Sequence, residues 1–349
     1  MIKISGIYHK IISKENLYQA AYMAAKARRY TDSVAEFNFH LEEEIEMLQM
    51  ELKEKNYNHG QYRVFTVYDP KERKIAAAPF RDRVVHHAAH DVIEPLIDKT
   101  FVYHSFACRK NKGTHKAIDW AQKFLKLNAF CFHGDIKKYF FSIDRAILKD
   151  ILRKRIEDQD LLWLLDKIIG SATYAGEQKG LPIGNLTSQF FANLYLNELD
   201  YFVKFDLGVK FYIRYMDDFI VFENDKEKLV KFKEKIRDFL KIKLMLELHE
   251  GKSQVYNTKS GIKFLGFRIF ENHKRLATNN VRRFKKRLKK FGYLLDRRQI
   301  KERQIRDSVR CWVAHSSYAN TNGLRLNIFN DLMGRDKYFG GLLKDVLCN

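Results

Sequence analysis

The chain has 349 residues, 46% of them hydrophobic and 14% aromatic, which excludes an intrinsically disordered protein and allows about two or three packed units. The 64 Lys and Arg residues against 43 Asp and Glu give a net charge of +21, so the expected partner is a polyanion such as nucleic acid. No apolar run is long enough for a membrane span or a signal peptide, and the four cysteines form no C-x-x-C pair. We therefore expect a soluble, cytoplasmic protein without zinc, disulfides or a membrane anchor.

Hydrophobic periodicity predicts alternating helices and short strands along the chain. Helical spacing is found in residues 14–55, 80–96, 147–170, 186–203 and 226–239. Strand patterns are found in residues 62–68, 129–133, 209–222 (as a hairpin), 244–248 and 262–269. A Gly-rich loop is expected at 175–184, and the 4 Pro residues and the lack of a Gly/Ser-rich linker predict one continuous body.

The predicted hairpin carries two adjacent acids, Asp217 and Asp218, at its tip. The flanking runs 209–214 and 219–222 are rich in β-branched and aromatic residues, as in short strands. Neighbouring carboxylates repel, so the turn needs a cation, and a hard divalent ion such as Mg²⁺ is the natural one. The alternative is an ordinary hairpin with a polar turn, because Asp is common in turns.

A second acid, Asp135, follows the apolar strand 129–133. At the end of a buried strand, its carboxylate can share ions with the hairpin acids in an antiparallel sheet. Two ions held in this way would stabilise the attacking and leaving oxygens of an in-line phosphoryl transfer.

Composition changes after about residue 279. Residues 281–310 contain 13 Lys or Arg and three acids, with Phe284, Leu288, Phe291 and Leu295 at helical spacing. This pattern favours a phosphate-binding amphipathic helix over a merely solvated basic surface. The predicted nucleic-acid-binding residues are Arg282, Arg283, Lys285, Lys286, Arg287, Lys289 and Lys290.

In order, the motifs resemble those of a reverse transcriptase. Residues 79–85 and 105–115 resemble the first two conserved blocks. Residues 134–140 resemble motif A, residues 180–200 resemble motif B and residues 215–218 resemble motif C. Lys252 stands at the place of the motif D lysine, and residues 264–267 resemble the primer grip. The resemblance implies an RNA-directed DNA polymerase of bacteria, archaea or phages. It implies an α+β right-hand fold, with fingers and an antiparallel-sheet palm in residues 1–270 and a basic helical thumb in 271–349.

The resemblance also implies metal ligands. Asp135, Asp217 and Asp218 would hold two Mg²⁺ ions, with Mn²⁺ as an alternative. Asp217 would be the direct ligand of the hairpin pair, and the Ile136 carbonyl would be an additional oxygen ligand.

Further residues would bind the nucleotide. Phe140 occupies the steric-gate position that excludes a ribose 2′-OH, with a core phenylalanine as the alternative. Arg109, Lys71 and Lys74 are candidates to hold the triphosphate, because a polyanion needs several cations. Lys252 is a candidate general acid toward pyrophosphate, with a solvated lysine as the alternative.

Motif B departs from the usual pattern. Most reverse transcriptases carry Gln-Gly and Ser-Pro where this chain has Ile183-Gly184 and Ser188-Gln189. This resembles the enzymes of diversity-generating retroelements, which copy a template RNA into cDNA with errors opposite adenine and work with a small basic accessory protein. The alternative is a group II intron-like or retron-like enzyme of ordinary fidelity, in which Ile183 only repacks the site. The implied partners are template RNA, a cDNA or DNA primer, dNTPs and that accessory protein, and the oligomeric state is left open.

Overall fold

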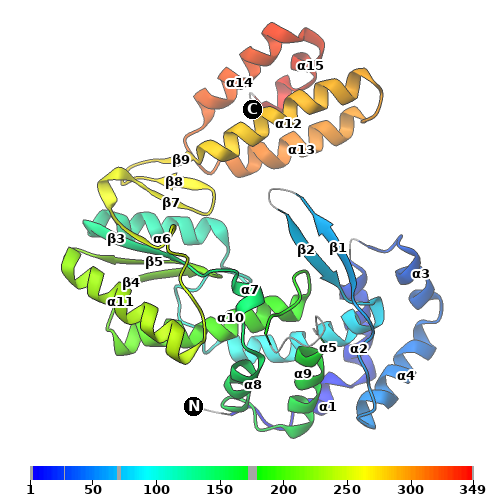
Figure 1. Cartoon of the computed structure of the whole chain (residues 1–349). Coiled ribbons are helices and arrows are strands. Elements are labelled where there is room, and N and C mark those ends of the chain that lie inside the picture. The colour runs from blue at the N-terminus through cyan, green and yellow to red at the C-terminus, as the bar shows by residue number, and fades with distance from the viewer. Residues whose placement is uncertain (1–2, 27, 69–71, 172–178, 348–349) are drawn as a thin grey trace. The chain divides into compact units, whose positions relative to one another are not determined.

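The computed structural model describes residues 3–26, 28–68, 72–171 and 179–347. Helices account for most of these residues (Figure 1). In chain order the helices are α1 (Tyr8–Ile11), α2 (Lys14–Ala25), α3 (Asp32–Phe39), α4 (Leu41–Lys53), α5 (Phe80–Asp98), α6 (Thr114–Leu127), α7 (Tyr139–Ser142), α8 (Arg145–Arg153), α9 (Gln159–Gly170), α10 (Leu186–Tyr201), the π-helix η1 (Phe202–Asp206), α11 (Lys226–Lys243), the 3-10 helix η2 (Thr258–Ser260), α12 (Thr278–Asp296), α13 (Glu302–Ser316), α14 (Asn322–Arg335), α15 (Lys337–Leu342) and α16 (Lys344–Leu347).

Short strands form three sheets within the described residues. The strands are β1 (Arg63–Val67), β2 (Arg73–Ala77), β3 (Phe130–Asp135), β4 (Phe211–Tyr215), β5 (Asp218–Glu223), β6 (Gln254–Asn257), β7 (Ile262–Phe264), β8 (Phe267–Ile269) and β9 (Lys274–Leu276). β1 and β2 pair antiparallel, β7, β8 and β9 form an antiparallel sheet, and the remaining sheet has the order β4-β5-β3-β6. The mixture of helices and sheets confirms the predicted α+β class.

Three of the predicted elements differ from the structure. The helical stretch expected over 14–55 is three helices, α2, α3 and α4. The helix expected over 147–170 is two helices, because Asp158 caps α9 by accepting a hydrogen bond from the Leu161 N–H at 3.1 Å. The expected strand at 244–248 is not a strand, because the N–H groups of Leu244 and Leu246 both bond to the carbonyl of Leu240 and so end α11. Of this segment only Leu248 pairs as a bridge, with Ile136. The expected loop at 175–184 lies partly outside the described residues.

The chain divides into two compact units. The first contains residues 1–113, 133–221 and 230–254. Within it, α5 packs against α2 and α10 (Figure 1). Most residues of α10 are buried. All of the predicted metal ligands belong to this unit.

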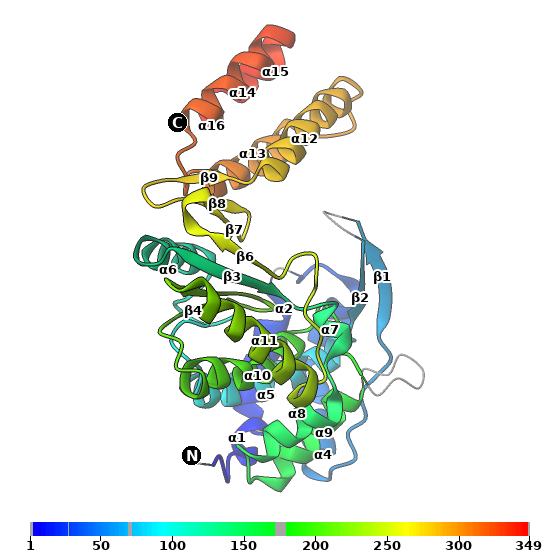
Figure 2. The same ribbon diagram turned by 60° about the vertical axis from the view of Figure 1, so that its left-hand side comes forward.

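The second unit contains residues 114–132, 222–229 and 255–349. In this unit α12 lies beside α13 in both views (Figures 1 and 2). The rings of Phe284 and Trp312 stack between these two helices with their centroids 3.6 Å apart. The basic stretch is therefore a helical pair with a common apolar seam, and it breaks after Asp296.

Candidate active site

The turn between β4 and β5 presents Met216 and Asp217 at its tip. β4 ends at Tyr215 and β5 begins at Asp218, so the turn contains only these two residues. Met216 has a φ of 56°, in the left-handed region, which costs a residue with a side chain on the order of 1–3 kcal/mol. Such strain persists only where the surrounding structure imposes it, and it gathers at functional sites. The predicted hairpin is confirmed, with a strained tip.

A buried arginine holds this turn in place. Arg214 donates hydrogen bonds to the Met216 carbonyl at 3.1 Å, to both Asp200 carboxylate oxygens at 2.7 and 2.6 Å, and to Asn193. The Arg214 and Asp200 side chains are fully buried, and the Tyr212 hydroxyl also donates to Asp200. Burial alone would lower the pKa of Arg214, but the Asp200 carboxylate outweighs burial and raises this pKa. A permanently charged group therefore positions the turn.

Asp135 ends β3, which lies next to β5 in its sheet. The close packing of these strands requires Gly134, because a Cβ at this position would lie 2.3 Å from the ring of Phe219 on β5. This close packing brings Asp135 near enough to Asp217 for its charge to raise the pKa of Asp217. The structure thus brings together the two acidic positions that the sequence pattern paired.

The surroundings of Asp217 perturb its ionisation. Burial raises its pKa to about 6, although a hydrogen bond from its own backbone opposes the change. The charges of Asp135 and Asp218 raise the pKa further, and Lys252 lowers it. A half-buried carboxylate among like charges is stabilised when a cation binds.

The other two carboxylates have side-chain partners in this structure. The Lys252 ammonium donates to the Asp135 oxygens at 2.6 and 3.0 Å, and His133 Nε2 bonds to Asp218 Oδ1. Lys252 was predicted from its motif, and the structure places it in the site. His133 was not predicted, although its position two residues before Asp135 on the same strand puts both side chains on one face.

The carbonyl of Ile136 is oriented away from the neighbouring segment. The Lys137 N–H bonds to the Glu247 carbonyl, and the His249 N–H bonds to the Asp135 carbonyl. Ile136 and Leu248 therefore form a non-hydrogen-bonded antiparallel pair, in which the carbonyl of each residue points away from the other. This orientation is compatible with the predicted role of Ile136 as an oxygen ligand.

The donor chemistry of the site fits a hard divalent ion. Carboxylates of Asp135, Asp217 and Asp218 with a backbone carbonyl are the oxygen ligands that Mg²⁺ prefers. In the described part of the chain, however, no three His, Cys, Asp or Glu side chains converge on one point as a metal group. Asp135 and Asp218 are instead paired with Lys252 and His133, so ion binding would require these pairs to open.

Phe140 and the motif B loop are joined through their backbones. The Phe140 carbonyl accepts a hydrogen bond from the Leu181 N–H at 2.8 Å, two residues before Ile183. The Ile183 carbonyl accepts from the Ala76 N–H of β2 at 3.0 Å. Gly184 has a φ of 116°, and a Cβ there would lie 2.8 Å from the side chain of Ile75, so glycine is required. The steric-gate candidate, Ile183 and β2 thus form one connected group.

Gln189 lies on the first turn of α10 and is exposed. Its Oε1 accepts a hydrogen bond from the thiol of Cys108 at 3.4 Å. The structure therefore places Gln189 beside the second conserved block, and its amide remains open to solvent.

The predicted triphosphate contact of Arg109 stays a prediction, and the structure gives this arginine a protein partner. Its guanidinium is 7% exposed and donates to the Asp98 carboxylate and to the carbonyls of Val102 and Ser105. These bonds fold the segment 98–109 around the arginine, so a triphosphate would have to displace the Asp98 carboxylate. Lys74 lies exposed on β2 and remains available, whereas Lys71 lies outside the described residues.

The basic residues of α12 are all exposed, and Phe284 and Leu288 between them are buried. This confirms the predicted amphipathic helix. The exposed residues are Arg282, Arg283, Lys285, Lys286, Arg287, Lys289 and Lys290.

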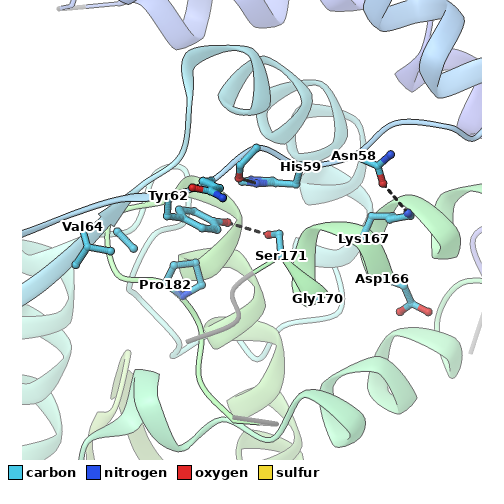
Figure 3. Close-up of a pocket in the computed structure, with 12 residues that line it drawn as sticks. Asn58, His59, Tyr62, Val64, Asp166, Lys167, Gly170, Ser171 and Pro182 are labelled. Atoms are coloured by element: carbon cyan, nitrogen blue, oxygen red, sulfur yellow. Dashed lines mark hydrogen bonds between the residues drawn. The ribbon is translucent and has the colours of Figure 1, made fainter. Parts of the chain in front are cut away.

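A cavity of about 610 Å³ lies between the start of β1 and the end of α9 (Figure 3). The ring of His59 stacks on Tyr62, whose hydroxyl bonds to the Ser171 hydroxyl at 3.0 Å, and Lys167 donates to the Asn58 side chain. Asp135, Asp217 and Asp218 are not among the described residues that line this cavity. These hydrogen bonds link the segment before β1 to the end of α9. Since the three carboxylates do not line the cavity, it is not the catalytic centre.

The supports of the hairpin were not predicted from the sequence. Asp200 and Asn193 lie in motif B without an assigned role, and Arg214 directly precedes motif C. A charged residue inside an apolar strand pattern, as at Arg214, is the signal that could have indicated a buried partner.

The site defines a class of protein. A strand-end carboxylate beside a strained acidic hairpin, with oxygen donors and a lysine around them, is an arrangement suited to metal-dependent phosphoryl transfer. The chain belongs to the Reverse transcriptase (RNA-dependent DNA polymerase) family, whose profile matches residues 52–269. It is therefore an RNA-directed DNA polymerase. No helix in the described ranges is both long and apolar enough to cross a membrane.

Several curated proteins are similar to this chain. Protein YkfC of Escherichia coli (strain K12) is 24% identical over 284 residues, covering 68% of this chain and 74% of that protein. Group II intron-encoded protein LtrA of Lactococcus lactis subsp. cremoris is 23% identical over 299 residues, covering 65% and 50%. The putative COX1/OXI3 intron 2 protein of Saccharomyces cerevisiae is 22% identical over 261 residues, covering 56% and 30%. The chain thus spans about half the length of LtrA.

Proposed function

We propose that this polymerase copies a template RNA into cDNA with frequent errors at template adenines, as in the mutagenic retrohoming of diversity-generating retroelements. The observation that carries the proposal is Ile183-Gly184, at the place where most reverse transcriptases have Gln-Gly. Ile183 offers no side-chain amide and has a stiff β-branched side chain.

The surroundings of Ile183 support this role. Its carbonyl is bonded to Ala76, and Asn185 donates to the Ala76 carbonyl at 3.2 Å, so the loop backbone is fixed to β2. The Ile183 side chain is only partly buried and is therefore able to face a bound template. Without an amide, polar checking of the nascent base pair is weakened, and mispairs meet a smaller penalty.

The catalytic roles follow from the same site. Asp135, Asp217 and Asp218 would hold two divalent ions, with the Ile136 carbonyl as an additional ligand. When bound, such ions stabilise the attacking and leaving oxygens of phosphoryl transfer. Lys252 holds a proton at Nζ beside Asp135 and would deliver it to the leaving pyrophosphate. Phe140 would exclude a ribose 2′-OH, and Lys74 would contact the triphosphate.

We further propose the right-hand layout for this chain. Residues 1–270 would form fingers and palm, and residues 271–349 a thumb whose helix α12 follows the phosphates of the nucleic acid. Template RNA, a DNA or cDNA primer and dNTPs would be the substrates, and a small basic protein would be the accessory partner.

The substitution Ile183→Gln tests the fidelity proposal. Restoring one hydrogen-bonding amide, with a net value of about 1 kcal/mol, should lower misincorporation opposite template adenine by about fivefold. Sequencing of cDNA made on a defined RNA template measures this, and Ile183→Val is the control because it changes size without adding an amide. An unchanged error spectrum in Ile183→Gln would show that Ile183 does not set fidelity.

The second candidate is a group II intron-like or retron-like enzyme of ordinary fidelity. It is favoured by the similarity to LtrA, whose name describes a group II intron-encoded protein. The same sequencing separates the two candidates, because this one predicts wild-type errors opposite adenine no more frequent than those opposite the other bases.

A further inference from the structure

Three arginines with no carboxylate partner converge on a second cavity. The cavity measures about 470 Å³ and is lined by Arg28, Arg63 and Arg83, together with the start of α3. The arginines come from three segments that are distant in sequence: the turn before α3, the first residue of β1 and the first turn of α5. All three belong to the first unit.

The three arginines form no ion pair with any described residue. Within the described ranges, no carboxylate lies at ion-pair distance from any of the three guanidinium groups, although other arginines of this unit, such as Arg81 and Arg155, have such partners. The nearest candidate by sequence, Asp82, already accepts hydrogen bonds from the Tyr57 hydroxyl at 2.5 Å and the Gly60 N–H at 3.1 Å.

Arg83 shows the consequence of this convergence. Its Nε is buried without a hydrogen-bond partner, and its guanidinium lies over the ring of Phe80. Burial lowers the pKa of Arg83, and the charges of Arg28 and Arg63 lower it further. A buried donor without a partner is costly, so a bound acceptor would stabilise it.

The start of α3 adds donors to the same cavity. Thr31 is the N-cap residue of α3 and makes no side-chain capping bond, so the first N–H groups of the helix are not capped by a side chain. The N-terminus of a helix attracts anions through these N–H groups. Asp32 is the one acid among the described lining residues, and three guanidinium charges exceed its single negative charge.

We propose that this cavity is a phosphate-binding site, formed by Arg28, Arg63 and Arg83 at the start of α3. Guanidinium groups match phosphate oxygens with paired hydrogen bonds, and three of them from separate segments can surround one group. The phosphate is a backbone phosphodiester of the bound RNA or belongs to a nucleotide. The RNA source rests on the proposed function, whereas the site itself does not.

The test compares two pairs of opposite substitutions in the full-length protein. Arg63→Gln removes a positive charge from the cavity and Asp32→Asn removes the negative one. The matched controls are Arg237→Gln and Asp238→Asn, adjacent exposed residues of α11 in the same unit. Each control changes the total charge of the protein as its counterpart does. Affinity is measured by fluorescence anisotropy with a labelled single-stranded RNA of 12 nucleotides over a range of salt concentrations, and the KM for dNTPs is measured by primer extension.

If the phosphate belongs to the RNA backbone, Arg63→Gln should weaken RNA binding by about tenfold and lower the salt slope by about 1, while Asp32→Asn tightens binding. If the phosphate belongs to a nucleotide, Arg63→Gln should instead raise the KM for dNTPs. Its RNA affinity should then equal that of the control Arg237→Gln. The site is refuted if both cavity variants match their α11 controls in both measurements. A wild-type protein that bound RNA with this pattern but did not extend a primer would refute the polymerase roles and leave the site standing.

Discussion

Replacing Asp217 by asparagine should raise the free energy of unfolding by about 2–3 kcal/mol at pH 8 and leave it nearly unchanged at pH 4. The pKa of Asp217 is about 6 in the folded protein, above the ordinary value of 3.8. Between these values the folded state binds more protons than the unfolded state, so wild-type stability falls as the pH rises through this window. Asparagine resembles the protonated acid and removes this loss.

Urea unfolding of both proteins between pH 4 and pH 8 measures the effect. The variant Asp206→Asn, which also removes one carboxylate, corrects for the change in total charge. Millimolar Mg²⁺ should stabilise the wild type at pH 8 more than Asp217→Asn, because a ligand that binds only the folded state adds to stability. A constant difference between wild type and Asp217→Asn across the whole pH range would contradict the electrostatic description of the site.

Breaking the buried pair of Arg214 and Asp200 should have a larger effect in the opposite direction. Both side chains are fully buried, so Arg214→Met leaves the Asp200 carboxylate without a cation and should cost about 3–5 kcal/mol of stability. The double variant Arg214→Met/Asp200→Leu should recover part of this loss, because it removes both buried charges.

Activity separates positioning from stability in these variants. Arg214 donates to the carbonyl of Met216, so the double variant should still lack most primer extension even where its folded state is restored. Thermal unfolding monitored by circular dichroism gives the stability, and extension below the melting temperature gives the activity. A double variant that is stable and fully active would show that Arg214 supports the core and does not position the turn.

Much of the site was predictable because its acids stand in local patterns. Asp135 ends an apolar strand, and Asp217 and Asp218 lie between two β-branched runs, so the chain itself specifies their placement. Arg109 shows the limit of such patterns. Its motif suggested a phosphate contact, which stays a prediction, but no sequence pattern indicated that Asp98 binds its guanidinium.

The fold was predictable to a similar degree. Long periodic segments such as α5 and α11 were identified, whereas β2 and β6 were not. β2 reads Arg-Lys-Ile-Ala-Ala, with one β-branched residue and no aromatic residue, and β6 has only four residues, so neither shows a clear strand pattern. The cluster of Arg28, Arg63 and Arg83 depends entirely on tertiary structure, since nothing in the sequence brings these three positions together.

Primer extension on an RNA template is the most direct test of the central claim, with RNA binding measured in parallel for wild type and Asp217→Ala. The wild type should extend the primer with dNTPs in Mg²⁺, but not with rNTPs and not after chelation of the metal. Asp217→Ala should bind RNA as tightly and extend at least about a thousandfold more slowly, because it loses a carboxylate of the catalytic centre. Equal RNA binding with no Mg²⁺-dependent extension by either protein, or equal extension by both, would contradict the assignment of Asp135, Asp217 and Asp218 as the polymerase centre.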